Sequence, residues 1–270
     1  MKDISLHFTE KLATRGVETS AIGRILIDNP TDPHQGLALD HALLLKANDS
    51  KHRATIRFWS NPCSVILGRG QTLIQEVNQQ FCRENQIPIA RRISGGGAVY
   101  HDEGNLNISL FVPKTTIKNP DDIKSTTSSF THILKRSIEE TGIEIQADDF
   151  NNLLYRGLKV SGAAAYFTKD TILHHSTLLL SADLSKLEGS LIHHEEPKKG
   201  RSKYTPTTNL KDLKIDVWKR KYIELLEETL HTRFQLGSLT SEENALATRL
   251  KDIMYSDPSW IIDGERPTNL

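Results

Sequence analysis

The chain has 270 residues, of which 37% are hydrophobic, and its mean hydropathy of −0.42 is typical of an ordinary soluble protein. Lysine plus arginine and aspartate plus glutamate each total 34, so the formal net charge is zero and the composition favours neither a nucleic-acid nor a membrane partner. The two cysteines, Cys63 and Cys82, are too few for a disulfide framework or a four-thiolate zinc site and fit a reducing compartment. Residues 1–16 lack the apolar region of a secretory signal, and no apolar run reaches 18 residues, so we expect a cytoplasmic protein.

The first half of the chain alternates between predicted strands and helices, after a weakly patterned N-terminal extension at residues 1–20. Strands are expected where apolar residues alternate or run together, and helices where they recur every three or four positions. The expected strands are 23–30, 54–60, 64–71, 88–94 and 106–113, and the expected helices are 36–49, 74–86 and 121–142.

The second half predicts a meander of three strands followed by more helices. The strands are 152–157, 158–167 and 171–182, the helices are 184–192, 216–234 and 241–256, and irregular segments are expected at 193–210 and 257–270. No repeat, low-complexity tract or interdomain linker interrupts the pattern. We therefore expect one α/β (α+β) domain over residues 21–270, with a large mixed β-sheet and flanking helices.

The stretch RRISGGGAVYHDEGNLN, residues 91–107, combines three glycines with many polar side chains. Consecutive glycines can adopt positive φ and bring bare backbone N–H groups close to a ligand, while an arginine such as Arg92 can hold a phosphate with paired donors. Asn105 and Asn107 would share one face of a strand. The stretch matches neither the P-loop nor the Rossmann pattern. A hairpin with incidental polar residues would explain the glycines alone, but the flanking residues favour an anion site.

Three segments together resemble the lipoate–protein ligase family within the biotin/lipoate ligase superfamily. The glycine stretch is similar to the family's signature. GLKVSGAAAYFTKDTILHHSTLLLSADLSKL (157–187) resembles its second block, and YSDPSWIIDG (255–264) resembles the element that closes its catalytic domain. The resemblance spans roughly residues 23–264 and implies the catalytic-domain fold of that superfamily.

The resemblance also implies a two-step reaction. Lipoate and ATP, with Mg²⁺ as cofactor, would give lipoyl-AMP and pyrophosphate. A lysine of a lipoyl domain would then take the lipoyl group, on 2-oxoacid dehydrogenase E2 subunits or on glycine cleavage H protein. Lys159 in LKVSG matches the family's active-site lysine, where its ammonium would sit between the lipoate carboxylate and the α-phosphate. Without that context, a lysine in a strand is usually a solvated edge charge.

The remaining site residues follow from the same resemblance. Those implied to bind ATP or the adenylate, besides Lys159, are Arg92, Gly97, Ala98, Val99 and Tyr100. Those implied to bind lipoate, besides Lys159, are Gly68, Gly70, His175 and Ser176, although His175 could instead be a satisfied core histidine. Possible supporting residues are Ser94, His101, Asn105, Asn107, Gly162 and Ala163.

Two features depart from the family's pattern. The family commonly has Asn-Asp before its lysine strand, whereas this chain has Asn151–Asn152. An amide oxygen is a weaker ligand for a hard cation than a carboxylate, so the metal ligands are left open, with Asp148 or Asp149 as substitutes. The chain also ends after the catalytic domain, and so resembles the split form that depends on a separate small accessory subunit.

Other interpretations of the chain remain open. Related octanoyltransferases hold the acyl group on a cysteine near the equivalent of residues 150–152, where this chain has Phe-Asn-Asn, but a lipoyl or octanoyl amidotransferase is the main alternative. A non-catalytic lipoate- or nucleotide-binding subunit is another. A zinc site at residues 193–195 is disfavoured because adjacent histidines in a polar loop are usually solvated. The basic run at 198–203 could contact an acidic lipoyl domain, and Trp260 is expected to be a packing residue.

Overall fold

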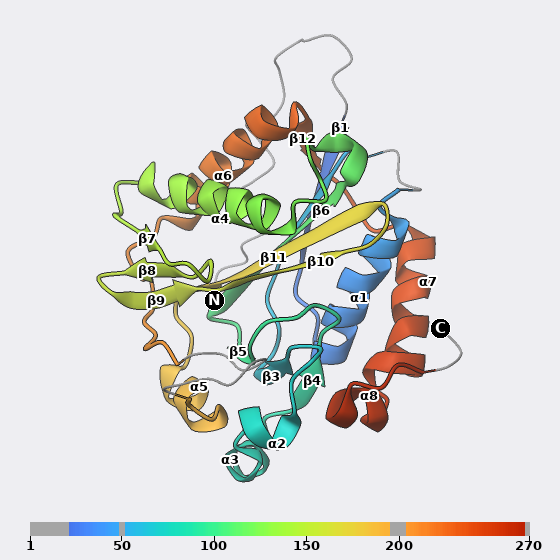
Figure 1. Cartoon of the computed structure of the whole chain (residues 1–270), viewed down its shortest axis with the longest axis vertical. Coiled ribbons are helices and arrows are strands. Elements are labelled where there is room, and N and C mark those ends of the chain that lie inside the picture. The colour runs from blue at the N-terminus through green and yellow to red at the C-terminus, as the bar shows by residue number, and fades with distance from the viewer. Residues whose placement is uncertain (1–21, 49–51, 195–203, 268–270) are drawn as a thin grey trace.

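The computed structural model describes residues 22–48, 52–194 and 204–267 (Figure 1). The predicted N-terminal extension at 1–20 and the basic run at 198–203 lie outside the described residues. The strands are β1 Ile22–Asp28, β2 Thr55–Trp59, β3 Ser64–Leu67, β4 Ile89–Arg91, β5 Val99–His101, β6 Asn105–Pro113, β7 Gln146–Ala147, β8 Leu153–Tyr155, β9 Leu158–Ser161, β10 Ala163–Phe167, β11 Thr171–Leu179 and β12 Arg233–Leu236. The helices are α1 Pro33–Lys46, α2 Leu73–Glu76, α3 Gln79–Glu84, α4 Ile123–Glu139, α5 Leu184–Ser190, α6 Ile215–Leu230, α7 Ser241–Leu250 and α8 Pro258–Asp263, with a 3₁₀ turn at Lys114–Thr116 and a π-helical turn at Lys251–Tyr255.

A six-stranded sheet forms the centre of the molecule, in the order β10-β11-β6-β2-β1-β12. β1 pairs in parallel with β2 and β12, whereas β6 pairs antiparallel with β2 and β11. Helices α4 and α6 cover one face and α1 and α7 cover the other (Figure 1). The predicted mixed sheet with flanking helices is therefore confirmed.

Two three-stranded sheets, β4-β3-β5 and β7-β8-β9, complete the fold. The expectation of one strand over 158–167 is wrong, because Gly162 divides it between β9 in a small sheet and β10 in the large one. The segment after β8 is therefore not a simple three-strand meander. This division places Lys159 on one sheet and the alanines that follow it on another, so the two sheets meet at Gly162.

The predicted helix over 74–86 is also interrupted. Val77 adopts an extended conformation with φ −123° and ψ 127°, and it pairs with Leu191 in an isolated bridge. The Asn78 side chain then accepts a hydrogen bond from the N–H of Phe81 and caps α3. The apolar periodicity of the sequence continues through residues 77 and 78 and therefore gives no sign of this break. The bridge to Leu191 and the N-cap at Asn78 cause it.

The C-terminal part contains two elements that the sequence pattern did not indicate. The helix expected to reach residue 234 ends at Leu230, because His231 adopts a left-handed conformation with φ 47°, and β12 follows as an edge strand. The tail expected to be irregular contains α8, whose N-cap Asp257 accepts a 2.7 Å hydrogen bond from Ser259 N. Pro258 at the first helical position suits this start.

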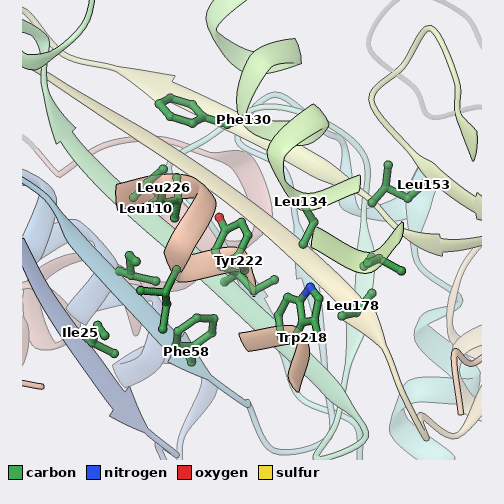
Figure 2. Close-up of a cluster of buried hydrophobic side chains, with 14 of the residues drawn as sticks. Ile25, Phe58, Leu110, Phe130, Leu134, Leu153, Leu178, Trp218, Tyr222 and Leu226 are labelled. Carbon is green, nitrogen blue, oxygen red and sulfur yellow. The ribbon is translucent and has the colours of Figure 1, made fainter. Parts of the chain in front are cut away.

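Apolar side chains from α4 and α6 pack against one face of the large sheet (Figure 2). Phe58 of β2 contacts Trp218 and Tyr222 edge-on, and the indole N–H of Trp218 donates to Ser137 Oγ at 2.9 Å. A second cluster lies between the opposite face, α1, α7 and α8, and includes Trp260. Because burying one large apolar side chain stabilises a fold by about 1.5–3 kcal/mol, these two clusters hold the sheet rigid beneath the site. No helix within the described ranges is long and apolar enough to cross a membrane.

Candidate active site

A cavity of about 470 Å³ lies where the large sheet meets β9 and the glycine loop, which we define as residues 92–98. Its walls are mostly apolar. Among the residues predicted from sequence, those that line it are Arg92, Gly97, Ala98, Val99, Tyr100, His101, Asn107, Asn152, Lys159, Gly162, Ala163, His175 and Ser176. Residues from three separate segments of the sequence, 92–107, 152–163 and 175–176, therefore share one cavity.

Arg92 holds the glycine loop in shape. Its Nη2 donates to the carbonyls of Gly95 and Gly97 at 2.6 and 2.8 Å, and its Nη1 donates to Ile66 O at 3.2 Å. The guanidinium is buried, and burial lowers its pKa to about 10, so it is still charged at neutral pH. The arginine expected to contact phosphate thus binds the carbonyls of the loop that lines the cavity.

Lys159 projects from β9 toward the same cavity. Its backbone N–H donates to Pro206 O at 2.8 Å, and its carbonyl accepts from Thr208 N at 2.9 Å. A Cβ on Gly162 would lie 3.1 Å from Lys159 Nζ, so the missing side chain leaves room for the ammonium. Burial lowers the pKa of Lys159 from its ordinary 10.5, while the Asp148 carboxylate opposes that shift and Arg92 adds to it. The half-buried Lys159 side chain thus lines the cavity beside Gly162, and Asp148 and Arg92 both act on its charge.

Several buried polar atoms at the cavity find no hydrogen-bond partner among the described residues. They are His101 Nε2, Asn107 Nδ2, Ser161 Oγ and Thr207 Oγ1. A buried polar group without a partner is costly, so these atoms are available to hydrogen-bond a water or a ligand in the cavity. Burial also lowers the pKa of His101 to about 3, which keeps this imidazole neutral at physiological pH.

Comparisons with known proteins agree with this geometry. The model for the lipoyl protein ligase A/B catalytic domain matches residues 32–230. Lipoate–protein ligase 1 of Staphylococcus aureus is 34% identical over 243 residues, which covers 86% of this chain and 71% of that protein. The chain belongs to the lipoyl protein ligase A/B family.

Solved structures show the same fold. A bi-partite lipoate protein ligase from Thermoplasma acidophilum, solved in a study that includes its E2 lipoyl domain, is 27% identical with a TM-score of 0.78, covering 93% of this chain and 100% of that one. A T. acidophilum structure with bound lipoic acid is 28% identical with a TM-score of 0.76, covering 89% and 99%. A lipoate-protein ligase A bound with ATP is 27% identical with a TM-score of 0.76, covering 90% and 100%.

Four residues that the ligase-family resemblance implied do not line the cavity: Gly68, Gly70, Ser94 and Asn105. Gly68 instead supports the glycine loop from behind, since a Cβ there would lie 2.0 Å from Gly96 O. Asn105 Nδ2 donates to Asn107 Oδ1 at 3.0 Å and so orients a residue that does line the cavity. Ser94 similarly orients His175, which lines the cavity, because Ser94 Oγ lies 2.6 Å from His175 Nε2.

Other lining residues were missed from sequence. Ser109 lies two positions after Asn107 on β6, and Thr177 two after His175 on β11, so strand alternation could have found both. Trp59, Tyr204 and Thr207 come from segments without a recognisable motif, and only the tertiary structure brings them to the cavity.

Asn152 stands at the position where the family resemblance led us to expect aspartate, and it binds Asp148. Asp148 Oδ2 accepts from Asn152 Nδ2 at 2.8 Å, and Asp148 Oδ1 accepts from the N–H groups of Phe150 and Asn152, each at 2.9 Å. Both carboxylate oxygens are therefore engaged. No cluster of three His, Cys, Asp or Glu side chains suited to a metal occurs in the described segments, which include His193 and His194. Asp148 and Asn152 therefore do not fit a preformed carboxylate site for Mg²⁺.

The two cysteines do not line the cavity. Cys63 Sγ lies 3.3 Å from the Tyr100 hydroxyl, and Cys82 is buried, where desolvation raises the pKa of its thiol to about 11. Residues 150–152, near which the octanoyltransferases would be expected to have an acyl-holding cysteine, are Phe-Asn-Asn, and Phe150 and Asn152 line the cavity. The cavity thus offers no thiol nucleophile.

Proposed function

We propose that this chain is a lipoate–protein ligase, which activates lipoate with ATP and transfers the lipoyl group to a lysine of a lipoyl domain. The observation that carries the proposal is the placement of the Lys159 ammonium and the glycine loop on one mostly apolar cavity. A lysine ammonium suits the meeting point of a carboxylate and a phosphate, and an apolar wall suits an aliphatic acyl chain.

In the first step, a lipoate carboxylate oxygen attacks the α-phosphorus of ATP. A new P–O bond forms, and the bond to the β-phosphate oxygen breaks, so pyrophosphate leaves with its electron pair. The cavity's contribution is positioning and charge. Lys159 lies between the two anions and neutralises charge that develops there. Arg92 and the backbone of Gly97, Ala98, Val99 and Tyr100 hold the nucleotide.

In the second step, the neutral amine of the acceptor lysine attacks the carbonyl carbon of lipoyl-AMP. An amide C–N bond forms, the C–O bond to AMP breaks, AMP leaves with that electron pair, and the amine nitrogen releases one proton to solvent. Lys159 then stabilises the leaving phosphate rather than attacking the substrate itself. His175 and Ser176 adjoin the lipoyl chain, with Ala163 forming part of the wall.

The proposal includes partners. We infer a separate accessory subunit, because the fold matches a bi-partite ligase over 93% of this chain and all of that chain. We further infer acceptor lipoyl domains on E2 subunits and on glycine cleavage H protein, and action in the cytoplasm. Because Asp148 and Asn152 already bind each other, Mg²⁺ would arrive with ATP rather than occupy a protein-built site.

Lipoate-dependent exchange of pyrophosphate into ATP tests the first step. We expect exchange that requires lipoate and is enhanced by the accessory subunit. Preformed lipoyl-AMP with a lipoyl domain tests the second step in isolation. Acyl transfer between carrier proteins without any ATP dependence would overturn the ligase proposal in favour of an amidotransferase, and binding without either step would indicate a non-catalytic subunit.

A further inference from the structure

Arg91, the neighbour of Arg92, points away from the cavity and binds only backbone carbonyls. Its Nη1 donates to Gly68 O, Arg69 O and Gln71 O at 3.0, 3.1 and 2.6 Å. These carbonyls belong to the turn after β3, which we call the support turn and define as residues 68–71. The guanidinium is completely buried. One side chain therefore donates to three of the four carbonyls of the support turn, and Gly68 O also accepts from Gln71 N at 3.1 Å.

The same guanidinium also binds the C-terminal helix. Nε donates to Ile261 O at 3.0 Å and Nη2 donates to Ile262 O at 2.8 Å, both in the last turn of α8. A helix C-terminus carries partial negative charge on its free carbonyls, which favours a cation there. In return, the indole N–H of the fully buried Trp260 donates to Arg91 O at 2.9 Å. Helix α8 and strand β4 thus each donate hydrogen bonds to the other.

The support turn in turn contacts the glycine loop. Arg69 N donates to Ser94 O at 2.9 Å, and Arg92 N donates to Leu67 O at 3.0 Å. A Cβ on Gly68 would lie only 2.0 Å from Gly96 O, which shows how closely the two backbones approach. A shift of the support turn would therefore displace the loop that faces the nucleotide.

We propose that Arg91 is a positioning residue that couples the docking of α8 to the shape of the glycine loop, so that α8 sets the affinity of the site for ATP. Arginine suits this role because its planar fork of five N–H donors can reach carbonyls of two segments at once, which a lysine ammonium cannot do. The identity of the ligand rests on the proposed function, but the coupling between α8 and the loop does not.

The test compares two buried tryptophans that each lose one indole hydrogen bond. Trp260→Phe removes the bond to Arg91 O, and Trp218→Phe removes the bond to Ser137 Oγ on the far side of the sheet. Both variants should lower the melting temperature. Only Trp260→Phe should raise the KM for ATP in lipoate-dependent exchange, by about fivefold, the effect of one lost hydrogen bond, with little change in kcat.

Hydrogen exchange of the ligand-free chain provides a readout that does not depend on activity. We expect faster exchange of the amides at 94–98 in Trp260→Phe and unchanged exchange there in Trp218→Phe. Arg91→Lys, which keeps the charge but loses the fork, should reproduce both effects if Trp260→Phe does not fold. If the two tryptophan variants have equal KM values for ATP and equal hydrogen exchange at 94–98, the proposed coupling between α8 and the glycine loop is wrong. If the wild type shows no lipoate-dependent pyrophosphate exchange but the amides at 94–98 still exchange hydrogen faster in Trp260→Phe, only the proposed function is contradicted.

Discussion

The hydroxyl oxygen of Ser94 lies 2.6 Å from Nε2 of His175, and it also accepts a 3.1 Å hydrogen bond from Arg92 Nε. Because arginine can only donate, the Ser94 proton remains available, and we expect it to be donated to Nε2 of His175. Burial, with nearby Arg92 and two histidines, holds the pKa of His175 well below its usual range, so the ring is neutral. In that expected arrangement, the single proton of the ring lies on Nδ1.

We expect Ser94→Ala to remove this tautomer preference and to raise the KM for lipoate by about three- to tenfold, the effect of one hydrogen bond. Two-dimensional ¹H–¹⁵N spectra of the imidazole nitrogens measure the tautomer directly. His174 lies on the opposite side of the same strand and gives an internal reference that should not change. An unchanged His175 tautomer in the variant would show that Ser94 does not set it.

Lys159 yields a prediction about charge and pH. Its ammonium should be required for adenylate formation, so Lys159→Ala should lose about 10²–10³-fold in exchange rate while its melting temperature is preserved. The charged form is lost as pH rises through its pKa, which burial lowers and the Asp148 carboxylate raises. Replacing that carboxylate in Asp148→Asn should therefore move the alkaline limb of the pH–rate profile to lower pH. A limb that stays in place would contradict the assignment of that limb to Lys159.

Asn152→Asp tests whether a carboxylate at position 152 would create an Mg²⁺ site together with Asp148. In the wild type, Asn152 Nδ2 donates to Asp148 Oδ2 at 2.8 Å. The variant would place two carboxylates together, and we expect a loss of roughly 1–2 kcal/mol in the free energy of unfolding. Added Mg²⁺ should restore part of that loss in the variant, because paired carboxylates suit a hard cation, and should not stabilise the wild type. Equal responses of the two melting temperatures to Mg²⁺ would contradict this interpretation.

The sequence predicted the principal site residues better than it predicted the path of the chain around them. Lys159, the glycine loop and His175 were expected together and do share the cavity. Gly162 was read as an interior strand residue, because a break between two sheets leaves no trace in apolar periodicity. The motif likewise could not assign different tasks to Arg91 and Arg92, since only the fold decides which guanidinium faces α8.

The glycines at 68 and 70 provide a final test of the support turn. Both were expected to bind lipoate, yet Gly68 packs against the glycine loop and nothing lies within 4 Å of a Cβ built on Gly70. Gly68→Ala would force a Cβ to within 2.0 Å of Gly96 O, so we expect a loss of about 1–3 kcal/mol in the free energy of unfolding. Gly70→Ala should change it by no more than about 0.5 kcal/mol. Denaturant unfolding of both variants measures the difference, and equal values would show that the close contact between the turn and the loop does not contribute to stability.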